Sequence, residues 1–303
     1  MSKHAYLIIA HNNFEILEKT LKILDDEKND FYIHIDKKVK NFDFERVKNI
    51  VKKSKINFTE RIDVKWGHSS QIDCELILLK SAVKNNYSYY HLLSGVDIPI
   101  KSKDEIYNFF EKNLGKEFIH TSIINNKSEL NSRYYYYHLF PHYSRSSYKY
   151  IIGVIEKVFL KIQKILKINR VKNKNIKFFY GAQWFSITND LVEYILSKEE
   201  WIQQTFKYTS CCDEIFLQTL VGNSYFTNNL KIKCEEQRCL EHLENYILST
   251  GRYIDWKRGT PYTFRKEDFS DLINSKALFA RKFDLNTDRK IVDMIFEELN
   301  KEK

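Results

Sequence analysis

Short apolar runs alternate with segments of helical spacing along the first 120 residues, and this alternation limits what the chain can fold into. Residues 6–10 form a continuous apolar run, as expected for a strand that is buried on both faces. Residues 14–24 follow with apolar side chains at helical spacing. Repeated units of this kind predict an α/β fold with a mostly parallel sheet flanked by helices.

The other expected elements follow the same reasoning. Further strands are predicted at residues 31–35, 62–66, 89–93 and 118–120, with a helix at 70–84. Two short strands are expected around Gly181 within 178–188, followed by a helix that Asn189 or Asp190 could cap. Helices are also predicted at 151–168, 213–221 and 290–299. The 8 glycines and 3 prolines form no linker, so we expect a single domain over residues 1–303.

Polar and aromatic residues follow four of the predicted strands, where each strand ends. They are His11, Asp36, Trp66 with Gly67, and Asp97. Parallel strands bring their carboxyl ends to one edge of the sheet, and ligands bind there. The chain contains neither G-x-G-x-x-G nor G-x-x-x-x-G-K-[ST], so a dinucleotide site or a P-loop is not indicated.

Two groups of charged residues in the second half of the chain are candidates for chemistry. Asp213 and Glu214 open a predicted helix, where acids either favour the helix dipole or provide a general base. Arg281 and Lys282 lie between Phe279 and Phe283, and such cations either form surface ion pairs or bind an anionic ligand. Arg252 is a third candidate cation.

The positive charge of the chain is local. Between positions 156 and 177 there are eight basic residues and one acid, so this segment carries +7 of the net +9. A chain-wide footprint for nucleic acid is missing, and no nucleic-acid partner is expected. The amphipathic helix at 151–168 with its basic tail has two interpretations. It packs on the domain by its apolar face with solvated lysines, or it rests on an anionic membrane through residues 151–177.

The cysteines and the N-terminus indicate a reduced, cytoplasmic protein. The five cysteines contain no C-x-x-C pair, and a zinc site at Cys211, Cys212, Cys234 and Cys239 would have unusual ligand spacing. The apolar run at 6–10 is too short for a signal peptide, and no run is long enough to span a membrane. No zinc site is expected at these cysteines, and no nucleotide-cofactor motif occurs in the chain.

Six short motifs occur in the order found in glycosyltransferase family 14, the core-2/I-branching β-1,6-N-acetylglucosaminyltransferases and peptide O-xylosyltransferases. HLLSGVDIPI at 91–100 resembles the L-S-G-x-D-x-P segment of that family. The others are similar to H-x-D-K, V-x-W-G, G-S-Q-W-x-x-L-T, D-E-x-x and F-A-x-K-F, and they lie at 33–38, 64–67, 181–188, 213–216 and 279–284. The matches extend from about residue 5 to 284, nearly the whole chain.

This resemblance implies a GT-A-like fold, a UDP-sugar donor, inversion at the anomeric carbon and catalysis without a metal. Glu214 matches the catalytic base, Lys282 a lysine that binds the donor diphosphate, and Asp36 an acid that contacts the uridine. Arg252 matches the arginine partner of that lysine. The single acid Asp97 stands where metal-dependent transferases carry D-x-D, so fixed cations such as Arg281 could replace the ion.

The resemblance also implies an acceptor side. Gln183 and Trp184 fall in a segment near the acceptor and the donor sugar, although Trp184 is equally explained as a core tryptophan. Arg133 corresponds to an acceptor-side arginine, and Asp213 adjoins the base. Residues 1–120 would then form a nucleotide-binding half, and residues 121–303 an acceptor and catalytic half that includes the basic helix at 151–172.

The resulting hypothesis is an inverting, metal-independent transferase that moves a sugar, best N-acetylglucosamine, from UDP to a hydroxyl of a glycan. A bacterial enzyme of surface polysaccharide synthesis is expected, because the chain lacks the cysteines and the membrane anchor of the animal enzymes. Its acceptor could then be lipid-linked, at the inner face of the cell membrane. The alternative is a non-catalytic carbohydrate-binding protein that uses its 20 tyrosines and its tryptophans as sugar platforms.

Overall fold

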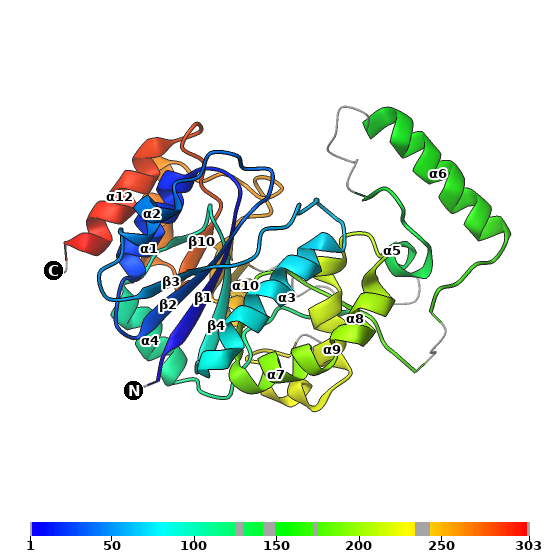
Figure 1. Ribbon diagram of the computed structural model, residues 1–303, viewed down its shortest axis with the longest axis horizontal. Helices are drawn as coiled ribbons and strands as arrows, with labels where there is room; N and C mark the ends of the chain where they lie inside the picture. The colour runs from blue at the N-terminus through cyan, green and yellow to red at the C-terminus, as the bar shows by residue number, and fades with distance from the viewer. Residues whose placement is uncertain (1, 125–129, 142–148, 172–174, 234–242, 302–303) are drawn as a thin grey trace.

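A five-stranded sheet lies at the centre of the computed structural model, which describes residues 2–124, 130–141, 149–171, 175–233 and 243–301 (Figure 1). Its strand order is β3-β2-β1-β4-β8. The central strand β1 (His4–Ala10) runs parallel to β2 (Asn29–Ile35) and to β4 (Tyr89–Ser94). At the edges, β3 (Lys55–Phe58) is parallel to β2 and β8 (Ser186–Thr188) is antiparallel to β4. The predicted α/β fold with a mostly parallel sheet is confirmed.

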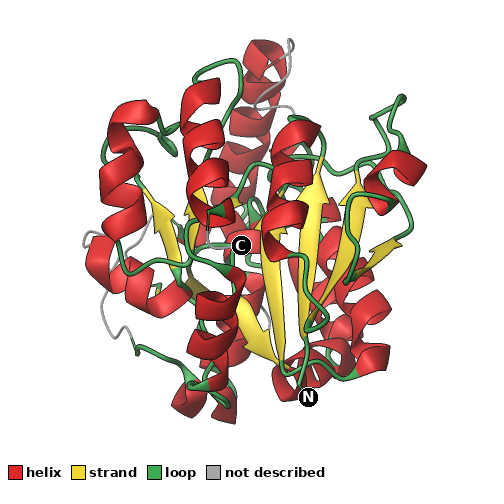
Figure 2. Ribbon diagram, turned by 90° about the vertical axis from the view of Figure 1, so that its left-hand side faces the viewer, coloured by secondary structure: helices red, strands yellow, loops and turns green. Residues whose placement is uncertain are grey.

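Helices cover both faces of this sheet, as Figure 2 shows. Alternate residues of β1 enter different apolar clusters, Leu7 one and Ile8 the other, which explains the continuous apolar run of that strand. The cluster around Leu7 is shared by α3 (Ser70–Ala82), α7 (Asn189–Ser197), α8 (Glu199–Phe206) and α9 (Phe216–Gly222). The cluster around Ile8 is shared by α1 (Phe14–Leu24), α2 (Phe44–Lys48) and α4 (Lys103–Glu111).

Two smaller sheets join segments that are far apart in sequence. One has the order β5-β10-β9 and contains β5 (Ile98–Pro99), β9 (Arg252–Ile254) and β10 (Phe279–Arg281). The other pairs β6 (Ser122–Ile123) with β7 (Phe179–Tyr180). The remaining helices are α5 (Asn131–Tyr135), α6 (Lys149–Ile165), α10 (Leu243–Thr250), α11 (Phe269–Asn274) and α12 (Arg289–Asn300). Single 3₁₀ turns lie at Val83–Asn85, Cys212–Glu214, Tyr225–Asn229 and Lys266–Asp268.

Two predicted strands are wrong. Residues 62–66 lie outside any strand, because the N–H of Ile62 donates to His34 Nε2 and its carbonyl accepts from the N–H of Lys37. The third strand of the sheet is instead β3, whose side chains alternate between exposed and half-buried. Residues 118–120 form only an isolated bridge between Phe118 and Ser186.

Three helix boundaries also differ from the predictions. Thr188, rather than Asn189 or Asp190, caps α7 by accepting a hydrogen bond from the N–H of Leu191. Helix α9 begins at Phe216, so the predicted start at residue 213 is wrong. The basic helix expected at 151–168 begins at Lys149 and ends at Ile165, and residues 172–174 of its basic tail lie outside the described residues. None of the described helices is long and apolar enough to cross a membrane.

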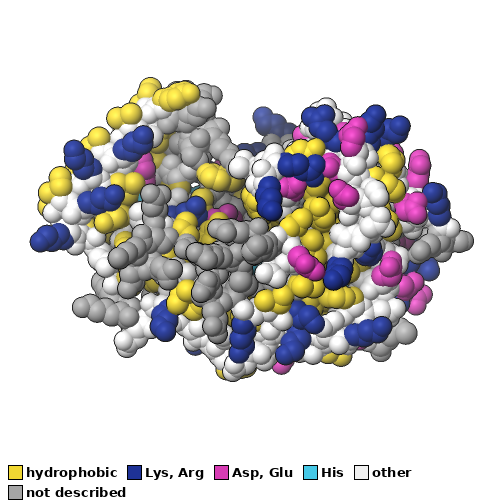
Figure 3. All heavy atoms as spheres, turned by 180° about the vertical axis from the view of Figure 1, so that it is seen from behind, with side chains coloured by type: hydrophobic (Ala, Val, Ile, Leu, Met, Phe, Trp, Pro, Cys, Tyr) yellow, Lys and Arg dark blue, Asp and Glu magenta, His cyan; other side chains and the backbone are white. Residues whose placement is uncertain are grey.

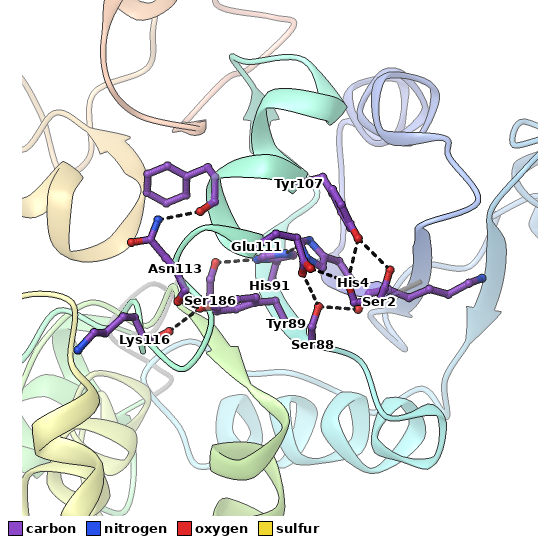
Figure 4. Close-up of polar contacts among 12 residues, drawn as sticks. Ser2, His4, Ser88, Tyr89, His91, Tyr107, Glu111, Asn113, Lys116 and Ser186 are labelled. Atoms are coloured by element: carbon purple, nitrogen blue, oxygen red, sulfur yellow. Dashed lines mark hydrogen bonds and ion pairs between the residues drawn. The ribbon is translucent and has the colours of Figure 1, made fainter.

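A buried polar network ties the sheet to α4 (Figure 4). His91 on β4 contacts Ser186 Oγ through Nδ1 at 2.8 Å and His4 Nδ1 through Nε2 at 3.1 Å. His4 Nε2 lies 3.3 Å from a carboxylate oxygen of Glu111 on α4. Burial lowers the pKa of His91 well below its usual value, so this imidazole is neutral and serves as a hydrogen-bonding link between strands.

Gly181 packs closely against the backbone at His120 and at Glu214. A Cβ built on it would lie 1.8 Å from the carbonyl oxygen of His120. Its N–H donates to the carbonyl oxygen of Glu214 at 2.9 Å, so the position of Gly181 also fixes the backbone at Glu214. Only glycine allows the backbone to approach this closely.

We expect Gly181→Ala to destabilise the protein by about 2 kcal/mol or more, because the added methyl group must push two backbone segments apart. Urea denaturation of the purified variant measures this loss. The matched control is Gly153→Ala in α6, where nothing lies within 4 Å of the added Cβ. It should be neutral or stabilising, by up to about 1 kcal/mol. Equal stability of the two variants would contradict the close packing at Gly181.

Candidate active site

The carboxyl ends of β1, β2 and β4 meet at one edge of the sheet. The N–H of Asp36 donates to the carbonyl of Ala10 at 3.0 Å, and that of Gly95 donates to Ile9 at 2.8 Å. His11, Asp36 and the turn from Ser94 to Asp97 therefore lie together, as the sequence predicted. His11 is exposed and within electrostatic reach of both Asp36 and Arg281.

The Asp36 carboxylate is almost fully buried and held from its own loop. It accepts a hydrogen bond from the N–H of Lys38 at 2.8 Å, and the Lys38 amine lies 3.1 Å from its other oxygen. Arg61 donates to the carbonyls of Ile35 and Asp36 and so holds the backbone on the other side. Lys38 belongs to the predicted motif at 33–38, whereas Arg61 lies outside every predicted motif and could not be singled out.

Asp97 and Arg281 form a buried ion pair at the same edge. Arg281 on β10 donates to Asp97 Oδ1 at 2.8 Å, and Asp97 is 3% exposed. Ser94 donates to the same carboxylate through its hydroxyl and its N–H. The guanidinium also lies over the ring of Trp184, 4.3 Å from its centroid. The ion-pair interpretation of Arg281 therefore holds, but the pair is internal and not on the surface.

The two other candidate cations have different surroundings. Lys282 is half-buried, and no carboxylate among the described residues lies within ion-pair distance of its amine. Arg252 is fully buried and donates to Ser186 Oγ at 3.0 Å and to the carbonyls of Leu92 and Phe185. Burial lowers the pKa of Arg252 to about 10. Its guanidinium joins β4 to the segment before β8, and a part in donor binding stays a prediction.

Glu214, the predicted base, forms an ion pair with Arg133. Its Oε2 accepts a hydrogen bond from Arg133 Nη1 at 2.8 Å, and the two side chains are 30% and 29% exposed. The Arg133 guanidinium also lies 5.6 Å from the centroid of the Tyr180 ring. The sequence predicted both charged residues but not that they would pair, because they are 81 positions apart.

Asp213 lies beside this pair but points inward. Its Oδ2 accepts a hydrogen bond from Gln71 Nε2 at 2.9 Å, and its Oδ1 has no partner among the described residues. Burial, together with the neighbouring charge of Glu214, raises the pKa of Asp213 to about 7. The two acids precede α9 and do not form its first turn. Asp213 instead accepts a hydrogen bond from Gln71, and Glu214 accepts one from Arg133.

A third carboxyl group, Glu75 on α3, completes this cluster. It is fully buried, and burial raises its pKa well above the usual value. Gln183 Nε2 donates to Glu75 Oε1 at 2.8 Å, while Oε2 has no partner among the described residues. Glu75 was not among the predicted site residues. The signal was present, because it is a lone acid in the apolar stretch Cys74-Glu75-Leu76-Ile77-Leu78.

The loop before β8 joins the carboxylates to the cations. Gln183 reaches Glu75, and its neighbour Trp184 lies under Arg281. Trp184 is also part of the apolar core, which confirms its interpretation as a core tryptophan, while a part in sugar binding stays a prediction. Trp66 is 43% exposed, and the carbonyl of the following Gly67 accepts from the N–H of Cys211 at 2.9 Å. The structure thus brings the predicted site residues into one continuous region.

No group of three His, Cys, Asp or Glu side chains within the described residues could hold a metal ion. Cys74, Cys211 and Cys212 are free thiols, whereas Cys234 and Cys239 of the considered zinc site lie outside the described residues.

The fold and the site define an α/β enzyme of the kind that binds its ligand at the carboxyl ends of parallel strands. Residues 4–274 match the family model described as Core-2/I-Branching enzyme. The chain therefore belongs to the core-2/I-branching enzyme family. The relatives that it resembles carry the names of glycosyltransferases.

Two of these relatives show the extent of the similarity. Xylosyltransferase 2 of Rattus norvegicus is 23% identical over 96% of this chain and 33% of its own length. The Homo sapiens β-1,3-galactosyl-O-glycosyl-glycoprotein β-1,6-N-acetylglucosaminyltransferase is 22% identical over 97% of this chain and 69% of its own length. The chain therefore spans about a third of the xylosyltransferase and about two thirds of the second enzyme.

Among solved structures, a Bacillus anthracis protein assigned as a glucose-1-phosphate thymidylyltransferase matches 63% of this chain and 74% of its own. The identity is 11% and the TM-score 0.29, so this similarity is too weak to define the fold.

We expect Arg281→Met to lower the free energy of unfolding by about 3 kcal/mol, because Asp97 would remain buried without its cation. The double variant Asp97→Asn with Arg281→Met should lose less than the sum of the two single variants. Urea denaturation of the four proteins gives the coupling energy. Lys282→Met is the matched control, with an effect within about 1 kcal/mol. Additive losses would show that the pair does not stabilise the fold.

Proposed function

We propose that the chain is an inverting glycosyltransferase that moves a sugar from a UDP-sugar to a hydroxyl group of a glycan acceptor. The observation that carries this proposal is the partly exposed Glu214 carboxylate beside Arg133, in the same region as Arg281 and Lys282. A base and fixed cations are the two groups that this reaction requires of a protein.

In the proposed reaction, the Glu214 carboxylate takes the proton of the acceptor hydroxyl. The oxygen attacks the anomeric carbon from the face opposite the UDP, so the new C–O bond forms as the bond to the diphosphate breaks. The configuration at that carbon is inverted, and UDP leaves with the electron pair. Arg133 fixes the orientation of the carboxylate through its 2.8 Å hydrogen bond.

Lys282 is the residue that we propose to bind the departing diphosphate. Its amine is half-buried and has no carboxylate partner within the described part of the chain, so its charge is available to an anionic ligand. Asp36, at the end of β2, is proposed to contact the uridine. Arg252 is proposed to support donor binding by holding β4 and the segment before β8 together.

Metal-independent catalysis is part of the proposal. It is supported by the surroundings of Asp97, the only acid in the segment that follows β4. Its carboxylate already receives Arg281 and two hydrogen bonds from Ser94, so its charge is compensated by the protein. A fixed guanidinium then stands where a divalent ion would otherwise be held.

The proposed donor is UDP-N-acetylglucosamine, which the name of the human relative supports, and UDP-xylose is the competing donor.

The proposed setting is bacterial surface polysaccharide synthesis in the cytoplasm, on a lipid-linked acceptor. Support for it comes from the free thiols and from the exposed basic helix α6. In the carbohydrate-binding alternative, Tyr134 is not a sugar platform, because it is buried and stacks on Phe178 with centroids 3.9 Å apart.

Replacing the proposed base gives a direct test. We expect Glu214→Gln to lower turnover by about a hundredfold or more while leaving UDP affinity unchanged, because a neutral amide cannot accept the proton. Turnover is measured as UDP release from UDP-N-acetylglucosamine and from UDP-xylose with a glycan acceptor, and affinity by calorimetry. The matched control is Glu45→Gln on the exposed surface of α2, which should keep the wild-type rate. Turnover of Glu214→Gln at the wild-type rate would exclude Glu214 as the base.

Diphosphate binding by Lys282 and independence from metal are tested together. We expect the protein to bind UDP in EDTA with the same affinity as in Mg²⁺ or Mn²⁺. Lys282→Met should weaken this binding about tenfold or more, because one charge-assisted contact is lost. Calorimetric titration with UDP measures both effects, and titration with uridine is the control that should not respond to the variant. Loss of UDP binding in EDTA would refute the metal-independent part alone.

A further inference from the structure

Helix α6 presents its apolar side to the solvent. Six of its apolar residues are between 48% and 69% exposed, namely Ile151, Val154, Ile155, Val158, Ile162 and Ile165. Their spacing of three or four positions places them in one stripe along the helix. Figure 1 shows α6 at the rim of the molecule, away from the central sheet. The interpretation that α6 packs on the domain by its apolar face is therefore wrong.

The side of α6 that is attached to the protein is mixed, with the half-buried Ile152, Phe159 and Leu160 beside Glu156 and Gln163. Gln163 is buried, and its amide donates to the carbonyl of Tyr137 at 3.0 Å and accepts from its N–H at 2.8 Å. Glu156 lies 2.9 Å from His138 Nδ1. These contacts fix the rotation of the helix about its axis. An amphipathic helix of a globular protein normally buries its apolar stripe, whereas α6 exposes it.

Lysines border the exposed apolar stripe. Lys157, Lys161 and Lys164 are exposed and follow one another on the side of the stripe that faces away from Gln163. The only acid of α6 is Glu156, which is turned toward His138. Figure 3 shows apolar side chains along the outer edge of this arm of the molecule, with basic side chains beside them. The outward surface of α6 is thus apolar and cationic, and it contains no carboxylate.

We propose that α6 binds the surface of a bilayer that contains anionic phospholipid. The helix would lie in the plane of the interface, with the apolar stripe at the acyl boundary and the lysines on the lipid phosphates. Charge complementarity selects this partner over a second copy of the chain, because a second α6 would bring the same lysines and no carboxylate. Its 17 residues span about 25 Å, which is the length of contact along the membrane.

This docking surface is close in sequence and in space to the proposed acceptor side. The residues that hold α6, Tyr137 and His138, directly follow α5, which contains Arg133. A bilayer bound at α6 would therefore lie near the segment that carries Arg133. This last step rests on the proposed function and points to an acceptor that is anchored in the membrane.

Vesicle flotation tests the proposal with the full chain. We expect the protein to bind vesicles of phosphatidylcholine with phosphatidylglycerol about a hundredfold more tightly than vesicles of phosphatidylcholine alone, given three lysines at the surface. The triple variant Ile155→Ser, Val158→Ser, Ile162→Ser should bind neither kind. The triple variant Lys157→Gln, Lys161→Gln, Lys164→Gln should lose the preference for anionic lipid. Both alter exposed side chains, and urea denaturation confirms that they fold.

The matched control removes three positive charges outside α6, by replacing the exposed Lys40, Lys52 and Lys53 with Gln. This variant should bind vesicles as the wild type does. Equal binding of the serine variant and the wild type would overturn the proposal. A wild-type dimer that the serine variant abolishes, without binding of the wild type to anionic vesicles, would assign the stripe to a second copy instead. Glu214→Gln should float like the wild type, so failure of the proposed catalysis is distinguishable from failure of membrane binding.

Discussion

The buried strand β1 is the element on which the rest of the architecture depends. It pairs with a parallel strand on each side, and its side chains enter apolar clusters on both faces. Such a strand leaves its backbone groups no partners other than its neighbours, so the register of β2 and β4 is fixed with it. Their carboxyl ends must then meet at one edge of the sheet. The polar segments that begin at His11, Asp36 and Ser94 therefore lie at this edge.

The second half of the chain completes this edge with charges that the first half lacks. Its strand β10 pairs with β5 and so brings Arg281 to Asp97, while the turn before α9 brings Glu214 to Arg133. Buried cations and carboxylates are stable here because each is paired or hydrogen-bonded. Arg252 is the extreme case, since its guanidinium is held by Ser186 and by main-chain carbonyls instead of a carboxylate.

Periodicity was sufficient for the parts of the fold in which one property dominates. The continuous apolar runs identified β1, β2 and β4, and the polar strand ends identified the edge where the site lies. The pairing of Glu75 with Gln183 could not be predicted, because 108 positions separate the two residues and nothing local relates them. Helix α6 shows a different limit. Its spacing predicts a helix and a stripe, but only the contacts of Gln163 and Glu156 determine that the stripe faces outward.

The adjacent residues Gln183 and Trp184 have a consequence for how the site responds to its ligands. The Gln183 side chain holds the buried carboxyl group of Glu75, and the Trp184 ring lies under the guanidinium of Arg281. A single stretch of backbone thus bears both contacts, and a ligand that displaces the tryptophan must also strain the glutamine. The carboxylate cluster and the cation cluster are therefore mechanically linked through two adjacent residues.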